Sequence, residues 1–204
     1  MPSASRSVYE VFPHQKEDLL FHLVSTTICE SPVLVFVRRK ETLHTLNTAA
    51  NHHGLASDNI SGNKKPEIRD RSLAKLKEGT IAVLFATESV LRESDLSGIA
   101  TIIHFDVHEI DANYLRHVES ASSKVITFIT KSDQNRLKSL VELTEGILEK
   151  SLAEGFTYDK QPRLIRTQPT KGKSNKTGSK PLQHKKPKLK NKGPRRKTGR
   201  TRKR

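Results

Sequence analysis

Acidic residues are absent from the end of the chain, and this absence divides the molecule into two parts. Positions 160–204 hold 19 Lys and Arg and no Asp or Glu, whereas positions 1–159 hold all 22 acidic residues and 18 basic ones. The formal net charge of +15 therefore belongs to the end of the chain, and the body is mildly acidic. Because this end also has few large apolar side chains, burial does not offset its ordering entropy. We predict a disordered Lys/Arg-rich tail over 151–204, most basic from 160.

Cysteine and long apolar runs are also scarce. Cys29 is the only cysteine, which excludes an intramolecular disulfide and a thiolate metal cluster and suits a reducing compartment. The longest apolar runs, VLVFV and IAVLFA, are far shorter than the roughly 20 residues that cross a bilayer. No apolar region follows MPSASRS, as it would in a signal peptide. We expect a soluble, intracellular protein without a membrane partner, cytoplasmic, or nuclear or nucleolar if the source is eukaryotic.

Apolar strands alternate with amphipathic helices along the body. The sequence predicts strands at 8–12, 33–37, 57–60, 81–86, 99–105 and 124–130. It predicts helices at about 15–28, 40–53, 66–78, 111–120 and 132–150. The last helix carries the clearest stripe, formed by Leu137, Leu140, Val141, Thr144 and Leu148. Apolar strands without polar alternation are typical of an α/β three-layer fold, with a mainly parallel sheet and helices on both faces. Such sheets bind ligands at the carboxyl ends of their strands.

Polar residues follow one of these strands in ATESVLRESDL, where Thr, Arg and Asp stand at the spacing T-x4-R-x2-D. The stretch from ISGNKKPEIRDR to IIHFD resembles the C-terminal RecA-like domain of DEAD-box RNA helicases, in which H-G, Q-x-x-R and A-T-D-x-x-x-R-G-x-D follow in this order. VLVFV resembles the motif IV strand, and NYLRHVESASSKVITFIT stands in the place of the motif VI segment Y-x-H-R-x-G-R-x-G-R. The resemblance implies a RecA-like domain over 8–150, after a flexible N-terminus at 1–7.

The resemblance implies a role for each matching residue. Gly62 would offer backbone amides to an RNA phosphate, Arg69 matches the Arg of the Q-x-x-R box, and Thr87 would give its hydroxyl to the RNA backbone. Arg92 and Asp95 match R-G-x-D, where the Asp is expected to meet the ATP ribose. Such groups bind sugar and phosphate without reading bases. In the structural alternative, Thr87 caps a helix and Arg92 pairs with Asp95.

Departures from the family pattern argue against catalysis. The arginine positions of motif VI hold His117, Ser120 and Ser123. In this family those arginines contact the γ-phosphate, and arginine fingers contribute about 10³ to 10⁵ in rate where they have been dissected. Arg116 is adjacent but out of register, and Glu93 and Glu119 add negative charge. The sequence also contains no phosphate-binding loop and no D-E-A-D box, because GKS at 172–174 follows Thr167 rather than the glycine of G-x4-G-K.

Three interpretations of function follow. The first is a stand-alone, non-catalytic module that binds RNA or ribonucleoprotein, with no cofactor. The second is the C-terminal half of an ATP-dependent RNA helicase, which would use ATP only if an N-terminal RecA-like domain complemented it in trans. The third is a structural protein of chromatin or the ribosome.

The tail supplies the candidate phosphate contacts Lys185, Lys186, Arg195 and Arg196. Positions 160–204 have no aromatic residue, so we expect little sequence preference. Two alternatives are a solubilising extension and a nuclear signal formed by Arg195, Arg196, Lys197 and Arg200.

His52 and His53, with His44 before them, raise the alternative of a metal site. No acidic or Cys partner stands at ligand spacing, so we interpret them as solvated histidines at a helix end and predict no metal. Cys29 has no His or Lys motif nearby, and we interpret it as inert packing.

Overall fold

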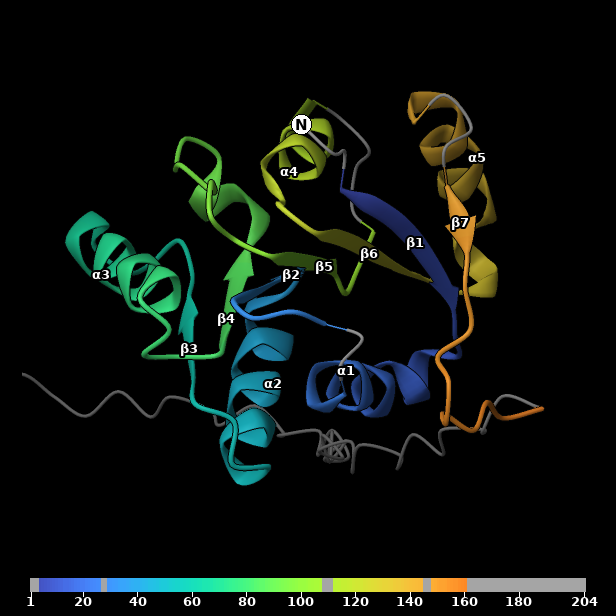
Figure 1. Ribbon diagram of the computed structural model, residues 1–204, viewed down its shortest axis with the longest axis horizontal. Helices are drawn as coiled ribbons and strands as arrows, with labels where there is room; N and C mark the ends of the chain where they lie inside the picture. The colour runs from blue at the N-terminus through green and yellow to red at the C-terminus, as the bar shows by residue number, and fades with distance from the viewer. Residues whose placement is uncertain (1–3, 27–28, 108–111, 145–147, 161–204) are drawn as a thin grey trace, which may run out of the picture. The chain divides into compact units, whose positions relative to one another are not determined.

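Seven strands form one sheet in the order β3-β4-β2-β5-β6-β1-β7 (Figure 1). The computed structural model describes residues 4–26, 29–107, 112–144 and 148–160. All neighbouring strands pair in parallel. The strands are β1 (Ser5–Glu10), β2 (Val33–Val37), β3 (Ser57–Ile60), β4 (Val83–Thr87), β5 (Thr101–His104), β6 (Lys124–Ile129) and β7 (Glu149–Lys150). Because every strand runs the same way, their carboxyl ends share one edge of the sheet.

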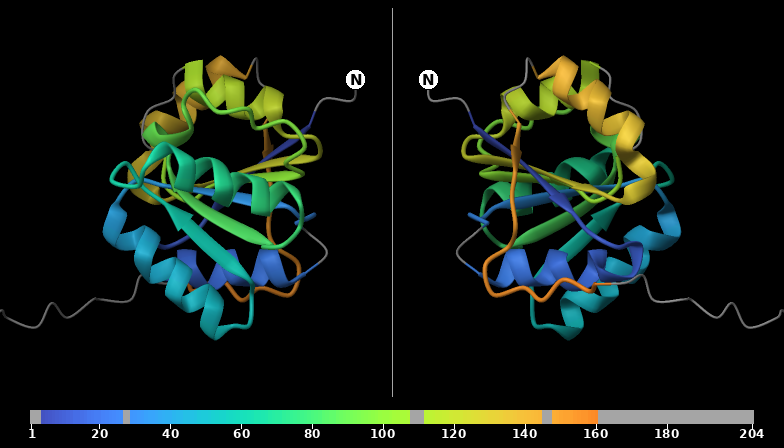
Figure 2. Two further views of the ribbon diagram at one scale, coloured as in Figure 1. Left: turned by 90° about the vertical axis from the view of Figure 1, so that its left-hand side faces the viewer. Right: turned by 90° about the vertical axis from the view of Figure 1, so that its right-hand side faces the viewer.

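Helices cover both faces of this sheet, as Figure 2 shows from the two sides. The helices are α1 (Lys16–Ser25), α2 (Lys40–His52), α3 (Pro66–Lys77), α4 (Ala112–Ser120) and α5 (Gln134–Leu143). Three 3-10 turns precede or follow them: η1 (Pro13–Gln15), η2 (Glu88–Leu91) and η3 (Lys131–Asp133). No helix within the described ranges is long and apolar enough to cross a membrane.

Alternate residues of β1, β2, β4, β5 and β6 contribute to two separate cores. On β2, Leu34 and Phe36 belong to the cluster that includes residues of α3, α4 and α5. Val35, on the opposite face, belongs to the cluster that includes residues of α1 and α2. A sheet buried on both faces accounts for strands that are apolar throughout. The structure confirms the predicted three-layer fold.

The last helix is shorter than its stripe predicted. The expected helix over 132–150 ends at Leu143, and Glu149–Lys150 instead form the edge strand β7. Two members of the stripe explain the difference. Val141 is 40% exposed, and the Thr144 hydroxyl donates to the Leu140 carbonyl at 2.8 Å, where the helix ends.

The folded body extends beyond the predicted limits of 8 and 150. At its start, β1 begins at Ser5. At its end, residues 151–160, called the strap from here on, pack against the body: Ala153 is buried, and Phe156 and Tyr158 contact the core on the α1 side. The Asp159 main-chain N–H donates to Gln15 Oε1 at 3.0 Å. Most of the predicted tail, residues 161–204, lies outside the described residues, as do residues 1–3.

Candidate nucleic-acid interface

The loop after β4 carries three of the residues predicted from the resemblance. Thr87 stands at the N-cap of η2, but its side chain makes no capping hydrogen bond. Arg92 and Asp95 follow, and both are exposed. We call residues 88–97 the η2 loop.

Asp95 is held by groups other than Arg92. Its carboxylate accepts hydrogen bonds from the Ser97 main-chain N–H at 2.9 Å and from the Ser97 hydroxyl at 2.7 Å. It also pairs with Lys77 of α3 at 3.0 Å. These contacts, the Ser97 N–H above all, lower the pKa of Asp95 to about 2. In place of the Arg92–Asp95 pair of the structural alternative, Asp95 pairs with Lys77, which ties the loop to α3.

Arg116 fixes the same loop from α4. Its guanidinium donates to the Leu91 carbonyl at 2.6 Å and to the Ser94 carbonyl at 2.9 Å. The side chain is half-buried. The arginine next to the motif VI register is therefore engaged with the main chain of the η2 loop.

The three motif VI positions provide no guanidinium. His117 is fully buried and stacks on the Phe36 ring, with the centroids 4.2 Å apart and the planes at 11°. The Ser120 hydroxyl donates to the Arg116 carbonyl at 2.7 Å. Ser123 is half-buried immediately before β6. A buried imidazole and two hydroxyls thus stand where the family has cations.

These side chains do not fit a bound triphosphate. Glu93 and Glu119 present exposed carboxylates on the η2 loop and on α4. The Asp95 carboxylate, expected to meet a ribose, is already bonded to Ser97 and Lys77. These carboxylates offer no positive charge to the phosphates of ATP.

An open hollow of about 710 Å³ lies between α3 and the η2 loop. It brings together three predicted residues, Arg69, Arg92 and Asp95, whereas Gly62 and Thr87 do not line it. Its charged side chains are Arg69, Lys77, Arg92, Asp70, Glu93 and Asp95. Because cations and anions are equal in number, the hollow by itself provides little net attraction for a phosphate backbone.

Gly62 lies in the turn that connects β3 to α3, and Arg69 lies in the first turn of α3. Arg69 Nε donates to the Lys64 carbonyl at 3.0 Å, which holds this turn against α3. Gly62 is exposed, and an added Cβ would meet no atom within 4 Å. Space alone therefore does not require glycine at this position. The other predicted contacts, Lys185, Lys186, Arg195 and Arg196, lie outside the described residues.

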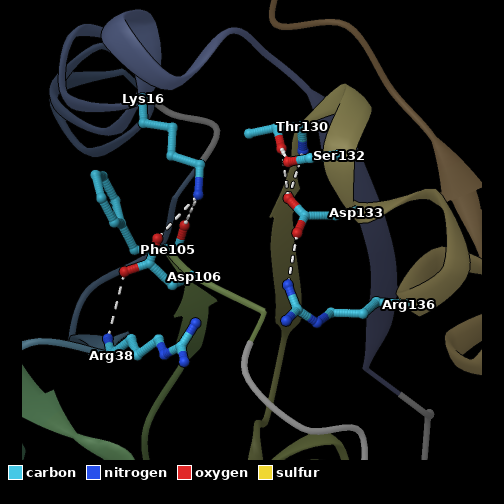
Figure 3. A network of polar contacts seen from close by, with 8 residues as sticks. All are labelled: Lys16, Arg38, Phe105, Asp106, Thr130, Ser132, Asp133 and Arg136. Carbon is cyan, nitrogen blue, oxygen red and sulfur yellow. Dashed lines mark hydrogen bonds and ion pairs between the residues drawn. The ribbon is translucent and has the colours of Figure 1, made fainter.

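The centre of the carboxyl edge is fixed by a buried lysine (Figure 3). Lys16 has a side chain only 10% exposed. Its ammonium donates to the Phe105 carbonyl at 2.8 Å and pairs with Asp106 at 2.9 Å. The second oxygen of Asp106 accepts from the Arg38 main-chain N–H at 3.3 Å. These contacts join the ends of β2 and β5 to α1.

A second ion pair follows β6 (Figure 3). Asp133 accepts hydrogen bonds from the Thr130 main-chain N–H at 2.9 Å and from its hydroxyl at 2.6 Å, and it pairs with Arg136 at 2.8 Å. Burial opposes ionisation of Asp133, but these hydrogen bonds prevail and lower its pKa. The arrangement is a capping box that starts η3, and α5 follows η3 directly.

The histidines considered for a metal site do not form one. The His53 ring packs on Phe21, with the centroids 4.7 Å apart. Within the part of the chain that the structure describes, no group of three or more His, Cys, Asp or Glu side chains is placed to hold a metal. Burial raises the pKa of Cys29 to about 12, which agrees with a packing role.

Sequence reasoning missed two features of this edge. Lys16 gave no signal, because a lysine at the start of a helix is ordinarily solvated. Arg116 gave a signal that was not used: the order Arg-His at 116–117 reverses the His-Arg of motif VI. That exchange turns the arginine toward the η2 loop and buries the histidine.

Comparisons with known proteins agree with this architecture. The model of the family described as helicase conserved C-terminal domain matches residues 15–122. The DEAD-box ATP-dependent RNA helicase CshA of Bacillus cereus is 31% identical over 174 residues, covering 81% of this chain and 33% of the helicase. The chain thus spans about a third of the length of the curated relatives that it matches.

Solved structures share the fold. A chain in the crystal structure of the E. coli DEAD-box protein SrmB bound to regulator of ribonuclease activity A has a TM-score of 0.71 at 20% identity, covering 79% of this chain and 98% of that one. The C-terminal domain of the DEAD-box protein Dbp5 has a TM-score of 0.65 at 20% identity, covering 72% and 90%. With the family match extending over more than half of its residues, this chain belongs to the helicase conserved C-terminal domain family, in the RecA-like form of the DEAD-box RNA helicases.

Proposed function

We propose that this domain is a non-catalytic module that binds RNA or ribonucleoprotein through the sugar-phosphate backbone. The observation that carries the proposal is the composition of motif VI, where His117, Ser120 and Ser123 replace the arginines. A module without those cations lacks the groups that stabilise the charge of phosphoryl transfer. RNA as the ligand is supported by the relatives, which are named as RNA helicases.

The body and the tail have different parts in this proposal. Arg69, Arg92 and Thr87 offer hydrogen-bond donors near the carboxyl edge, and they orient the strand. Most of the affinity comes from the 19 Lys and Arg of positions 160–204, including Lys185, Lys186, Arg195 and Arg196, because neutralising phosphates releases counterions.

A competition experiment tests this proposal. The full chain is bound to labelled single-stranded RNA and challenged with unlabelled single-stranded RNA or duplex DNA of the same length. We expect single-stranded RNA to compete better. Equal competition would instead favour a structural protein of chromatin or the ribosome.

Single substitutions in the body test whether Arg69 and Arg92 contact the RNA. Arg69→Ala and Arg92→Ala should each weaken RNA binding by about 2- to 5-fold, the range for an exposed charge contact. Lys138→Ala, an exposed lysine on α5, is the matched control because it also removes one charge. Equal losses in all three variants would show that only net charge matters.

A second candidate function is the C-terminal half of an ATP-dependent RNA helicase whose ATP-binding domain acts in trans. The relatives favour it, because they are named as ATP-dependent RNA helicases. Motif VI would still lack its arginines in such an assembly. A mixture with the separate N-terminal RecA-like domain of a relative tests it: this candidate predicts RNA-stimulated ATP hydrolysis that neither protein shows alone.

A further inference from the structure

The aromatic surface of the chain is concentrated at one place. The sequence has seven Phe, three Tyr and no Trp, and all ten lie within the described residues. Seven of these side chains are at most 7% exposed. The three that are half-buried are Phe12, Phe156 and Tyr158. Phe12 follows β1, and Phe156 and Tyr158 belong to the strap. The aromatic rings that are open to solvent therefore lie at the end of β1 and in the strap.

Phe12 and Tyr158 line a second hollow, of about 340 Å³, at the carboxyl ends of β1 and β7. We call it the strap hollow. Its apolar wall includes Leu152, which is 75% exposed. Its cations are Lys131, Lys150 and Lys160. A hollow of this volume lies in the range of small-ligand pockets.

The aromatic and cationic groups of the strap hollow are close to one another. The Lys131 ammonium lies 5.6 Å from the centroid of the Phe12 ring. The two carboxylates that line the hollow are paired: Glu10 with Lys150 at 2.6 Å and Asp159 with His14 at 2.8 Å. The Lys131 ammonium lies over the Phe12 ring, and the His14 ring also stacks on Phe12, with the centroids 5.7 Å apart. A base that stacks on Phe12 therefore takes the place of the ammonium. An aromatic ring beside lysines is the combination that binds single-stranded nucleic acid, where the ring stacks on a base and the cations meet phosphates.

The strap also fixes where the basic tail begins. Gln15 Nε2 donates to the Thr157 carbonyl at 3.1 Å, and its Oε1 accepts from the Asp159 N–H at 3.0 Å. Lys160, the first of the 19 Lys and Arg of the tail, lines the strap hollow. The basic segment of the sequence therefore begins at a residue of this hollow.

The strap hollow is separate from the region around Thr87. It lies at the β1 and β7 end of the sheet, whereas Thr87 ends β4, next to β3 at the other end. Neighbouring strands are about 4.8 Å apart, so the two places are separated by roughly 25 Å along the edge.

We propose that the strap hollow binds one base of single-stranded RNA by stacking on Phe12, with Lys131 and Lys160 at the flanking phosphates. This inference rests on the proposed RNA-binding function and adds a base contact to it. Positions 160–204 have no aromatic residue, so any preference for bases over bare backbone must arise on the body.

The test compares two ligands on the full chain: oligouridine of about 16 nucleotides, which is long for one binding fold, and an abasic oligomer with the same sugar-phosphate backbone. Anisotropy titrations should show about 5- to 150-fold tighter binding of oligouridine, the range for stacking of one base. Phe12→Leu keeps an apolar side chain but removes the ring, and it should bring the ratio close to one. Affinity for the abasic oligomer should not change.

Phe156→Leu is the matched control, because Phe156 is also half-buried in the strap but does not line the hollow. It should keep the ratio of the unaltered chain. Equal binding of the two oligomers by the unaltered chain, or a ratio that survives in Phe12→Leu, overturns the base contact and leaves the proposed function standing. Binding of neither oligomer overturns both.

A cross-linking experiment decides the matter if Phe12→Leu does not fold. Ultraviolet irradiation of the unaltered chain with oligouridine should yield a cross-linked peptide that contains Phe12 or Tyr158. Cross-links confined to peptides of the tail contradict the base contact.

Discussion

At the scale of single residues, Arg116 determines how the η2 loop is held. One guanidinium donates to two main-chain carbonyls, those of Leu91 and Ser94. The planar guanidinium group suits this task, because its N–H donors are fixed relative to each other. Arg116 directly precedes His117, the first of the motif VI arginine positions. Its guanidinium is bonded to the main chain of the η2 loop.

Arg116→Ala should lower the free energy of unfolding by about 1–3 kcal/mol, since two carbonyls lose a charged donor. Arg116→Lys should restore less than half of this loss, because an ammonium does not reproduce the fork. Urea denaturation measures both, with Lys138→Ala as the exposed control. A midpoint for Arg116→Ala equal to that of the control would show that the two hydrogen bonds contribute nothing.

A buried ring cluster makes stability depend on pH. His104 lies between Phe36, Tyr114 and His117, with centroids 5.5, 4.8 and 5.3 Å away. Burial, and then the charge of His117, lower the pKa of His104 well below 6.5. Between this lowered pKa and 6.5, the unfolded chain binds a proton that the folded chain does not.

The contribution of His104 is therefore complete above about pH 6.5 and is lost as the pH falls below it, by at most about 1.4 kcal/mol per pH unit. Urea denaturation at several pH values between 5 and 7.5 measures the slope. His104→Phe keeps a ring that does not titrate, and it should flatten the slope. His52→Asn, at the exposed end of α2, should leave it unchanged. An unaltered slope in His104→Phe would assign the pH dependence to other groups.

At the scale of elements, buried apolar runs were predictable and the edge of the sheet was not. β2 has the bounds predicted from VLVFV, because the run of five apolar residues was interpreted as a buried strand and all five are buried. β7 consists of two exposed residues, Glu149 and Lys150, without an apolar pattern. Its pairing depends on the open edge of β1, which no local pattern reveals. The stripe over 132–150 counted Val141 as buried, although it is 40% exposed, and its spacing continued past Leu143, where α5 ends.

In the candidate site, too, part of the arrangement was predictable from the sequence and part was not. The gathering of Arg69, Arg92 and Asp95 around one hollow follows from motif spacing and from the shared carboxyl edge of parallel strands. The pairing of Asp95 with Lys77 and the contacts of Arg116 depend on how α3 and α4 face the loop. The orientation of these two helices toward the loop is set by packing, and the sequence alone did not reveal it.

The strap should behave as part of the folded body. A chain ending at residue 160 should keep the unfolding free energy of the full chain, whereas one ending at residue 150 should lose at least about 2 kcal/mol. The shorter chain loses a buried Ala153 and the hydrogen bonds of the strap with Gln15, His14 and Val8. Urea denaturation compares the two. Equal stability of both truncated chains would show that the strap contributes nothing to the fold.

At the scale of the whole molecule, charge is distributed unevenly between the body and the basic segment that follows it. The body carries 22 acidic and 18 basic residues up to position 159, and the rest of the chain is basic throughout. A body with an excess of acid binds a polyanion weakly, whatever donors its loops present. The basic segment is therefore expected to set the strength of RNA binding.

Deleting residues 161–204 should remove most RNA affinity and most of its salt dependence. If about ten phosphates are engaged, the log-log slope of affinity against salt for single-stranded RNA should be near −7 in the full chain. Filter binding at several salt concentrations measures both chains. Undiminished binding by the truncated chain would show that the tail is incidental.

The most direct test of the central claim is phosphate release from ATP by the full chain with saturating single-stranded RNA, compared with Thr87→Ala. Thr87→Ala removes a hydroxyl expected to meet RNA and leaves the charges unchanged. Because His117, Ser120 and Ser123 stand where motif VI arginines would be, we predict no RNA-stimulated release above this control. Release that rises with RNA and clearly exceeds the Thr87→Ala rate would contradict the account.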